Sequence, residues 1–199
     1  MDRSFLPKTY PEVFFMFELL DAAKAFIEPI IRPDSVLCDF TMGNGHDTEY
    51  LCKKVPDGKV YAFDIQESAL VNTRKRLDDA GLSNAVLIHS SHANCKEYIK
   101  EPIDGGMFNL GYLPGSGNKS LHTMRESTLP AVTGAIELLK KGGVLVISIY
   151  PGHEEGRLEG EMLTSELSKL DKKYYCVTQF RLINSPDAPF IIAVEKYDK

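Results

Sequence analysis

The stretch VLCDFTMGNGHD, residues 36–47, joins an apolar run to two closely spaced glycines. The run predicts a short buried strand that ends at Asp39, and Gly43 and Gly45 predict a sharp turn into a helix. Glycine permits such a turn and lets a ligand approach the backbone closely. The stretch therefore predicts a strand–turn–helix unit with a ligand site at its turn.

The segments around this stretch alternate between strand and helix patterns. The predicted strands of the alternating part are 35–40, 59–65, 85–89, 105–112 and 144–150. The predicted helices between and after them are 47–55, 67–81, 93–100, 127–143 and 159–170. Two last strand patterns, 174–183 and 190–197, follow each other directly. Alternation predicts a parallel sheet, and the closing pair predicts an antiparallel hairpin at one edge. This is the element order of the class I methyltransferase fold, an α/β Rossmann-like fold with a mostly parallel seven-stranded sheet and helices on both faces.

The length and composition indicate one globular unit. A chain of 199 residues predicts a single domain, 1–199, in which 1–34 form an N-terminal helical extension with a helix from Pro11 to about Glu28. The net charge of -5 argues against broad adhesion to nucleic acid but leaves room for a local basic patch. The four cysteines form no CxxC pair, which favours reduced thiols in a cytoplasmic protein. The apolar run VFFMFELL is shorter than the ~20 residues of a membrane span, so we expect no membrane association.

The second predicted strand ends in an acid, Asp64, within VYAFD. An acid at this place can accept hydrogen bonds from both hydroxyls of a ribose. The dinucleotide pattern GxGxxG fails because Thr48 stands at its third glycine, whereas the methyltransferase pattern of an acid followed by alternate glycines is met except at Thr41. We therefore expect S-adenosyl-L-methionine as the cofactor. The residues expected to bind it are Asp39, Thr41, Gly43, Asn44, Gly45, Asp47, Asp64, Gln66, Ser91, His92 and Asn109.

Polar residues also follow the third predicted strand, in HSSHAN. Ser91 or His92 can contact the cofactor at this edge of the sheet. The alternative is a capping serine beside a solvated histidine. His89 and His92 form an HxxH pair, but no further ligands follow at the spacing of a metal site, so we expect no metal.

The fourth predicted strand reaches Asn109, where a doubly wound sheet binds its ligands. The sequence NLGY, residues 109–112, is related to the Asn/Asp-Pro-Pro-Tyr motif of amino-methylating enzymes of this fold. The side-chain carbonyl of Asn109 can accept hydrogens from an amine and so aim its lone pair, and Tyr112 can stack on a base. Asn109 and Tyr112 are therefore the candidate catalytic residues. The alternative is a plain structural turn.

The motifs GNGHDT, FDIQ, FNLGYLPG and INSPDAPFIIAVEK resemble those of a bacterial family long described as rRNA methylases. Its members are now assigned as MnmM, the tRNA 5-aminomethyl-2-thiouridine methyltransferases, and the resemblance runs from about Ser35 to Lys196. It implies methyl transfer to the exocyclic amine of 5-aminomethyl-(2-thio)uridine at the tRNA wobble position. The chain departs from the family at the loop after the third strand, where Ser90 or Ser91 replaces a frequent acid.

The resemblance makes the anticodon region of tRNA the expected partner. The loop after Asn109 can present backbone N–H groups to a phosphate, with polar or positive side chains nearby. The residues expected to bind the substrate are Gly111, Tyr112, Gly115, Lys119, His122 and Arg125. The alternative for Lys119 and Arg125 is an ordinary solvated charge. Two other functions stay open: methylation of another RNA or a small amine, and a catalytically silent nucleotide-binding module. The oligomeric state is also open, with a homodimer as one option.

Overall fold

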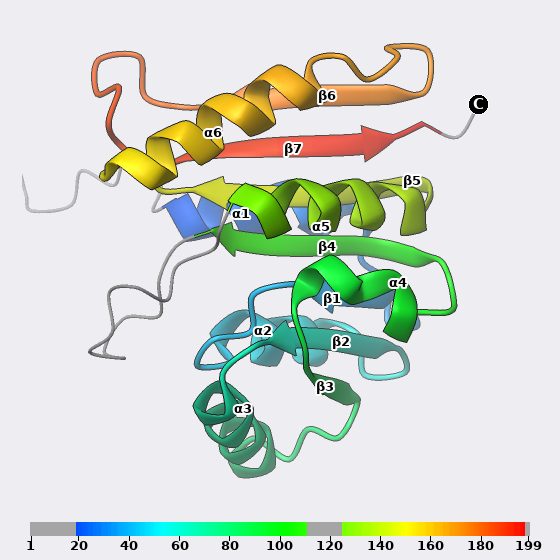
Figure 1. The fold of residues 1–199 in the computed structure, drawn as a ribbon. Coiled ribbons are helices and arrows are strands. Elements are labelled where there is room, and N and C mark those ends of the chain that lie inside the picture. The colour runs from blue at the N-terminus through cyan, green and yellow to red at the C-terminus, as the bar shows by residue number, and fades with distance from the viewer. Residues whose placement is uncertain (1–18, 111–124, 198–199) are drawn as a thin grey trace, which may run out of the picture.

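The computed structural model describes residues 19–110 and 125–197, which contain a seven-stranded sheet of order β3-β2-β1-β4-β5-β7-β6 (Figure 1). The strands are β1 (Val36–Asp39), β2 (Lys59–Asp64), β3 (Ala85–His89), β4 (Ile103–Leu110), β5 (Leu139–Ile149), β6 (Tyr175–Phe180) and β7 (Phe190–Lys196). Strands β1 to β5 pair in parallel, whereas β7 runs antiparallel to both β5 and β6. The predicted fold class is confirmed.

Helices cover both faces of the sheet. They are α1 (Leu19–Ile27), α2 (His46–Lys54), α3 (Glu67–Asp79), α4 (Cys95–Tyr98), α5 (Arg125–Leu138) and α6 (Glu154–Leu167). One core cluster packs α4, α5 and α6 against one face, and a second packs α1, α2 and α3 against the other. Figure 1 shows α4, α5 and α6 in front of the sheet and α1 behind it. No helix within 19–110 and 125–197 is both long and apolar enough to cross a membrane.

Strand β4 divides its side chains between the two faces. Phe108 belongs to the cluster under α4 to α6, and Met107 belongs to the cluster under α1 to α3. Side chains alternate along a strand, so Asn109 lies on the same face as Met107. The sequence thus places Asn109 beside α2, at the carboxyl end of the central strands.

Two predicted helix boundaries are wrong for identifiable reasons. The helix predicted to end at Gly143 ends at Leu138, because Leu139 already pairs with Ile103 before an irregularity in the β4–β5 register. The helix predicted from residue 159 begins at Glu154. His153 caps it, since the His153 ring nitrogen Nδ1 accepts a hydrogen bond from the Gly156 N–H at 3.0 Å. A histidine cap is not among the usual cap signals, which explains the late prediction.

Candidate functional site

The glycine turn between β1 and α2 has the backbone form that the sequence predicts. Gly43 has φ 51° and Gly45 has φ 78°, both in the left-handed region. A Cβ at Gly45 would lie 2.6 Å from Thr73 Oγ1 of α3. The same Thr73 hydroxyl donates to the Gly43 carbonyl at 3.2 Å. The turn is therefore held tightly against α3, and only glycine fits at Gly45.

Asp64 ends β2 and faces this turn. Its two carboxylate oxygens accept hydrogen bonds from the Gly43 N–H and the Gln66 N–H, each at 2.9 Å. Each oxygen of an ionised carboxylate has a second lone pair. Asp64 is only partly buried. It can therefore hold the turn and still accept hydrogen bonds from ligand hydroxyls.

Asp39 lies inside the turn and is 1% exposed. Its Oδ1 accepts from the Thr41 N–H at 3.1 Å, and its Oδ2 accepts from the Thr48 hydroxyl at 2.7 Å. Burial raises the pKa of Asp39 to about 7, and the neighbouring charge of Asp47 adds to that rise. In this structure Asp39 acts on the shape of the turn. Thr48, which stands where the dinucleotide pattern has its third glycine, is one of its hydrogen-bond donors.

Thr41 joins β1 to β4 at the same edge. Its hydroxyl oxygen accepts a hydrogen bond from the Asn109 N–H at 2.7 Å. The Asn109 side chain donates from Nδ2 to Oδ2 of Asp47, in the first turn of α2. Asn109 is thus fixed through both its backbone and its side chain, by two residues of the opening stretch.

Two buried polar atoms beside this contact lack a hydrogen-bond partner among the described residues. Asn109 Oδ1 and Ser148 Oγ are buried, and neither has a hydrogen-bond partner in the described part of the chain. Ser148 is the register partner of Asn109 on β5, so the two side chains lie on the same face. A buried polar atom without a partner costs about 1–3 kcal/mol. Such atoms at the carboxyl edge of a sheet indicate a place where a ligand supplies the missing bonds.

Ser148 was missed by the sequence analysis. The signal that could have found it is a serine within the otherwise aliphatic run VLVISI, residues 144–149. A polar residue in a strand that is buried on both faces needs a reason.

The two candidates after β3 differ in role. The Ser91 hydroxyl oxygen accepts from the Ala93 N–H at 3.2 Å and caps the short 3₁₀ turn His92–Asn94, which is the structural alternative for this serine. His92 is half-buried: its Nδ1 lies 3.0 Å from the Phe40 carbonyl, and its ring meets that of Phe108 edge-on at 5.6 Å. Burial lowers the pKa of His92, which favours the neutral ring. A carbonyl only accepts, so Nδ1 carries the proton. Nε2 is left as a buried acceptor without a partner among the described residues.

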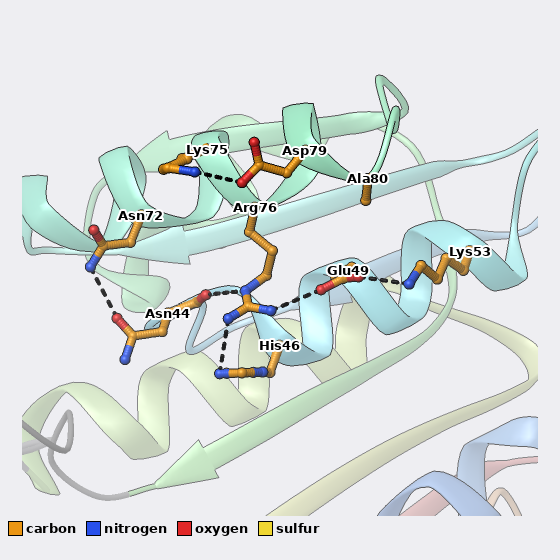
Figure 2. A pocket seen from close by; sticks show the side chains of 9 residues that line it. All are labelled: Asn44, His46, Glu49, Lys53, Asn72, Lys75, Arg76, Asp79 and Ala80. Carbon is orange, nitrogen blue, oxygen red and sulfur yellow. Dashed lines mark hydrogen bonds and ion pairs between the residues drawn. The ribbon is translucent and has the colours of Figure 1, made fainter.

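A groove of about 640 Å³ lies between α2 and α3 and is lined at one end by Asn44 of the glycine turn (Figure 2). Asn44 turns into it and accepts from Asn72 at 3.1 Å. Arg76 donates to the backbone carbonyl of Asn44 at 2.8 Å and to the Glu49 carboxylate at 3.0 Å. Lys53 also pairs with Glu49, at 2.6 Å. These groups satisfy one another, in contrast to the free atoms at the strand ends. We therefore place the site at the strand ends and interpret the groove as a charged contact between two helices.

Several expected site residues lie outside the described residues. They are Gly111, Tyr112, Gly115, Lys119 and His122. Arg125 is described only as the first residue of α5. Within the described ranges, no group of three or more His, Cys, Asp or Glu side chains could hold a metal ion.

The strand order, the reversed β7, the glycine turn after β1 and the acid at the end of β2 together define a class I methyltransferase fold. Residues 60–195 match the family model described as "Putative rRNA methylase". The chain belongs to this family.

Relatives over most of the chain agree with this assignment. A protein of Arabidopsis thaliana named "tRNA (mnm(5)s(2)U34)-methyltransferase, chloroplastic" is 35% identical, over 88% of this chain and 68% of that protein. A crystal structure from Clostridium thermocellum, described as that of a "putative rRNA-methylase", has a TM-score of 0.87 at 36% identity, over 92% of this chain and 99% of that chain. A crystal structure from Streptococcus mutans, described as "a putative methyltransferase" in complex with SAH, has a TM-score of 0.83 at 33% identity, with the same coverage.

Proposed function

We propose that this chain transfers a methyl group from S-adenosylmethionine to the exocyclic amine of 5-aminomethyl-(2-thio)uridine at the wobble position of tRNA. The observation that carries the proposal is the free, buried carbonyl of Asn109, fixed at the carboxyl end of β4. The name of the Arabidopsis relative supports the substrate class. The SAH in the Streptococcus complex supports the cofactor, since S-adenosylhomocysteine (SAH) is its demethylated product.

The residues at the strand ends fit this cofactor. Asp64 has lone pairs left for the ribose hydroxyls, and Gly43 and Gly45 present bare backbone beside it. His92 offers a buried acceptor at the next strand end. The Asp47 and Asp64 charges both raise the pKa of Asp39, after burial, so negative charge gathers here and favours a cationic ligand. When bound, the cofactor supplies a methyl group on a positively charged sulfur, which becomes a neutral thioether as the carbon–sulfur bond breaks.

The chain's own contribution to the chemistry is alignment. The nucleophile is the nitrogen lone pair of a neutral amine, which forms the new nitrogen–carbon bond and then loses a proton to solvent. Asn109 Oδ1 accepts one hydrogen of that amine and so turns the lone pair toward the methyl carbon. Holding two reactants at the right distance and angle is a large part of what an enzyme contributes to such a step. We assign no general base, because a neutral amine needs orientation and not deprotonation before it attacks.

The proposed partner is the anticodon region of tRNA. The proposed contact is the segment between β4 and α5 together with the first residue of α5, through Gly111, Tyr112, Gly115, Lys119, His122 and Arg125. An unpaired base is read by stacking and by contacts to its edges, which suits an aromatic residue directly after the Asn109 strand end. With a net charge of -5, affinity must come from such local contacts more than from overall charge.

The test is mass analysis of nucleosides after reaction. Purified protein is incubated with S-adenosylmethionine and with tRNA that carries 5-aminomethyl-2-thiouridine at the wobble position. The expected product is the same nucleoside heavier by one methylene. Matched tRNA with 2-thiouridine, which lacks the amine, is expected to stay unchanged. Methylation of rRNA and not of the aminomethyl tRNA would overturn the proposal.

A further inference from the structure

The contact between Asp47 and Asn109 has a chemical consequence beyond holding two elements together. Asp47 lies in the first turn of α2 and Asn109 near the end of β4, 62 residues apart in sequence. The Asn109 backbone is already fixed by Thr41. The freedom that remains is rotation of the side-chain amide, which exchanges its oxygen and its nitrogen.

Asp47 decides between these two orientations. An ionised carboxylate only accepts hydrogen bonds, whereas an amide has an accepting oxygen and a donating nitrogen. Nδ2 of Asn109 must therefore face Asp47, and Oδ1 must face away from it. Oδ1 is the buried atom without a described partner. The reversed amide would turn two donor hydrogens toward an amine that also carries hydrogens.

We propose that Asp47 is a positioning residue, which holds the Asn109 amide so that its carbonyl oxygen faces the substrate amine. The inference rests on the proposed function and adds to it a residue that acts through Asn109. It gives Asp47 a different role from the cofactor contact that the sequence suggested. The carboxylate contributes orientation and does not itself touch the reacting atoms.

Burial and three neighbouring groups act in opposite directions on the pKa of Asp47. Burial has the largest effect and raises the pKa above its usual value, while Lys24 of α1, the Asn109 hydrogen bond and His46 each lower it. The negative charge of Asp47 in turn raises the pKa values of the Asp39 carboxyl and of the Tyr50 and Tyr150 hydroxyls. The Asn109 bond is thus among the interactions that favour the ionised, acceptor-only form of Asp47.

The test is a cycle of Asp47→Asn and Asn109→Asp, read as turnover at saturating cofactor and tRNA. Asn109→Asp places two acceptors face to face, and we expect turnover to fall toward the ~100-fold loss that a misplacement of about 1 Å can cause. Asp47→Asn alone leaves both amide orientations open and should lower turnover less. In the double variant, the amide introduced by Asp47→Asn donates a hydrogen bond to the carboxylate introduced by Asn109→Asp. One carboxylate oxygen is then held in place, and the other faces the substrate amine as an acceptor. We expect the double variant to recover about tenfold over Asn109→Asp.

A second background covers the case in which Asn109→Asp does not fold. In Asn109→Ala there is no amide to orient, so adding Asp47→Asn should lower turnover no further. Glu49→Gln, an acid of the same helix that pairs with Lys53 and Arg76, is the matched control and should keep wild-type turnover. Calorimetry with SAH and thermal unfolding confirm that each variant is folded.

The outcomes separate the two proposals. Recovery in the double variant, or no added effect in Asn109→Ala, supports the positioning role. The positioning role is overturned if the fold-losses in turnover of the single variants multiply in both backgrounds while SAH affinity is unchanged. In that case, methylation of aminomethyl tRNA by the wild-type protein leaves the proposed function standing. A wild-type protein that binds SAH but methylates no aminomethyl nucleoside overturns the proposed function instead.

Discussion

The two ends of β4 use polar side chains in opposite ways. Asp104, near the amino end, is 5% exposed and surrounded by protein partners. Its Oδ2 accepts from the Val36 N–H and from Lys140 Nζ, each at 2.8 Å, and its Oδ1 lies 3.5 Å from the Arg32 guanidinium. Asn109, near the carboxyl end, keeps Oδ1 buried without a partner among the described residues. The two residues lie five positions apart on one strand. The Asp104 carboxylate stabilises the fold, whereas the Asn109 side-chain carbonyl is left for a ligand.

The difference shows where this fold accepts a cost. Asp104 ties β1, β5 and the segment before β1 to one carboxylate, as a buried charge requires. At the other end Asn109 Oδ1 and Ser148 Oγ lie side by side on β4 and β5 without described partners. Unpaired buried groups lower stability, so their presence together points to a function that uses them.

The largest expected effect compares two glycines at opposite ends of the sheet. Gly45 and Gly142 have nearly equal φ values, 78° and 77°. An added Cβ meets Thr73 at 2.6 Å in the first case and nothing within 4 Å in the second. Both alanine variants should lose about 1–3 kcal/mol from left-handed strain. Gly45→Ala should lower the free energy of unfolding by about 1–3 kcal/mol more, because the added Cβ overpacks against Thr73. It should also weaken cofactor binding. Denaturant unfolding and calorimetry measure both, and equal losses would break the comparison.

A smaller effect is expected for the acid that faces the turn. Asp64→Ala should weaken S-adenosylmethionine binding by about 1–3 kcal/mol, because it removes the acceptor for the ribose hydroxyls and a partner of the Gly43 N–H. The matched control is Glu101→Ala, since Glu101 pairs with Lys59 at the amino end of β2. Calorimetry should give the control a wild-type dissociation constant. A folded Asp64 variant with unchanged affinity would remove Asp64 from the site.

The remaining expected effect is a pH dependence of stability. The pKa of Asp39 is raised to about 7 in the folded protein, against about 3.9 when unfolded. Between these values the folded state binds more protons than the unfolded state, so the free energy of unfolding should fall as pH rises from about 4 to about 7. Asp39→Asn cannot ionise and should flatten this slope. Thermal unfolding at several pH values measures it, and an unchanged slope would show that Asp39 is not the titrating group.

The sequence predicted the frame of this molecule better than its site. The order of elements along the chain and the place of Asp64 at the end of β2 follow from alternating patterns and chain punctuation, which are local signals. No local signal predicts that both oxygens of the Asp39 carboxylate accept hydrogen bonds from Thr41 and Thr48, because these contacts depend on how the turn folds back. The meeting of Asp47 with Asn109 depends on a parallel pairing of β1 with β4 that skips two strands. Long-range contacts of this kind are decided by packing, so they come from the structure alone.

The most direct test of the account is the single-turnover rate of methyl transfer to an anticodon stem–loop carrying 5-aminomethyl-2-thiouridine. Asn109→Ala should be about 100-fold slower than wild type at saturating cofactor, because the amine loses its orienting acceptor. Asp104→Ala, whose cost falls on folding, should react at the wild-type rate per folded molecule. A wild-type rate for Asn109→Ala, or an equal loss in both variants, would contradict the division of β4 into a stabilising end and a reacting end.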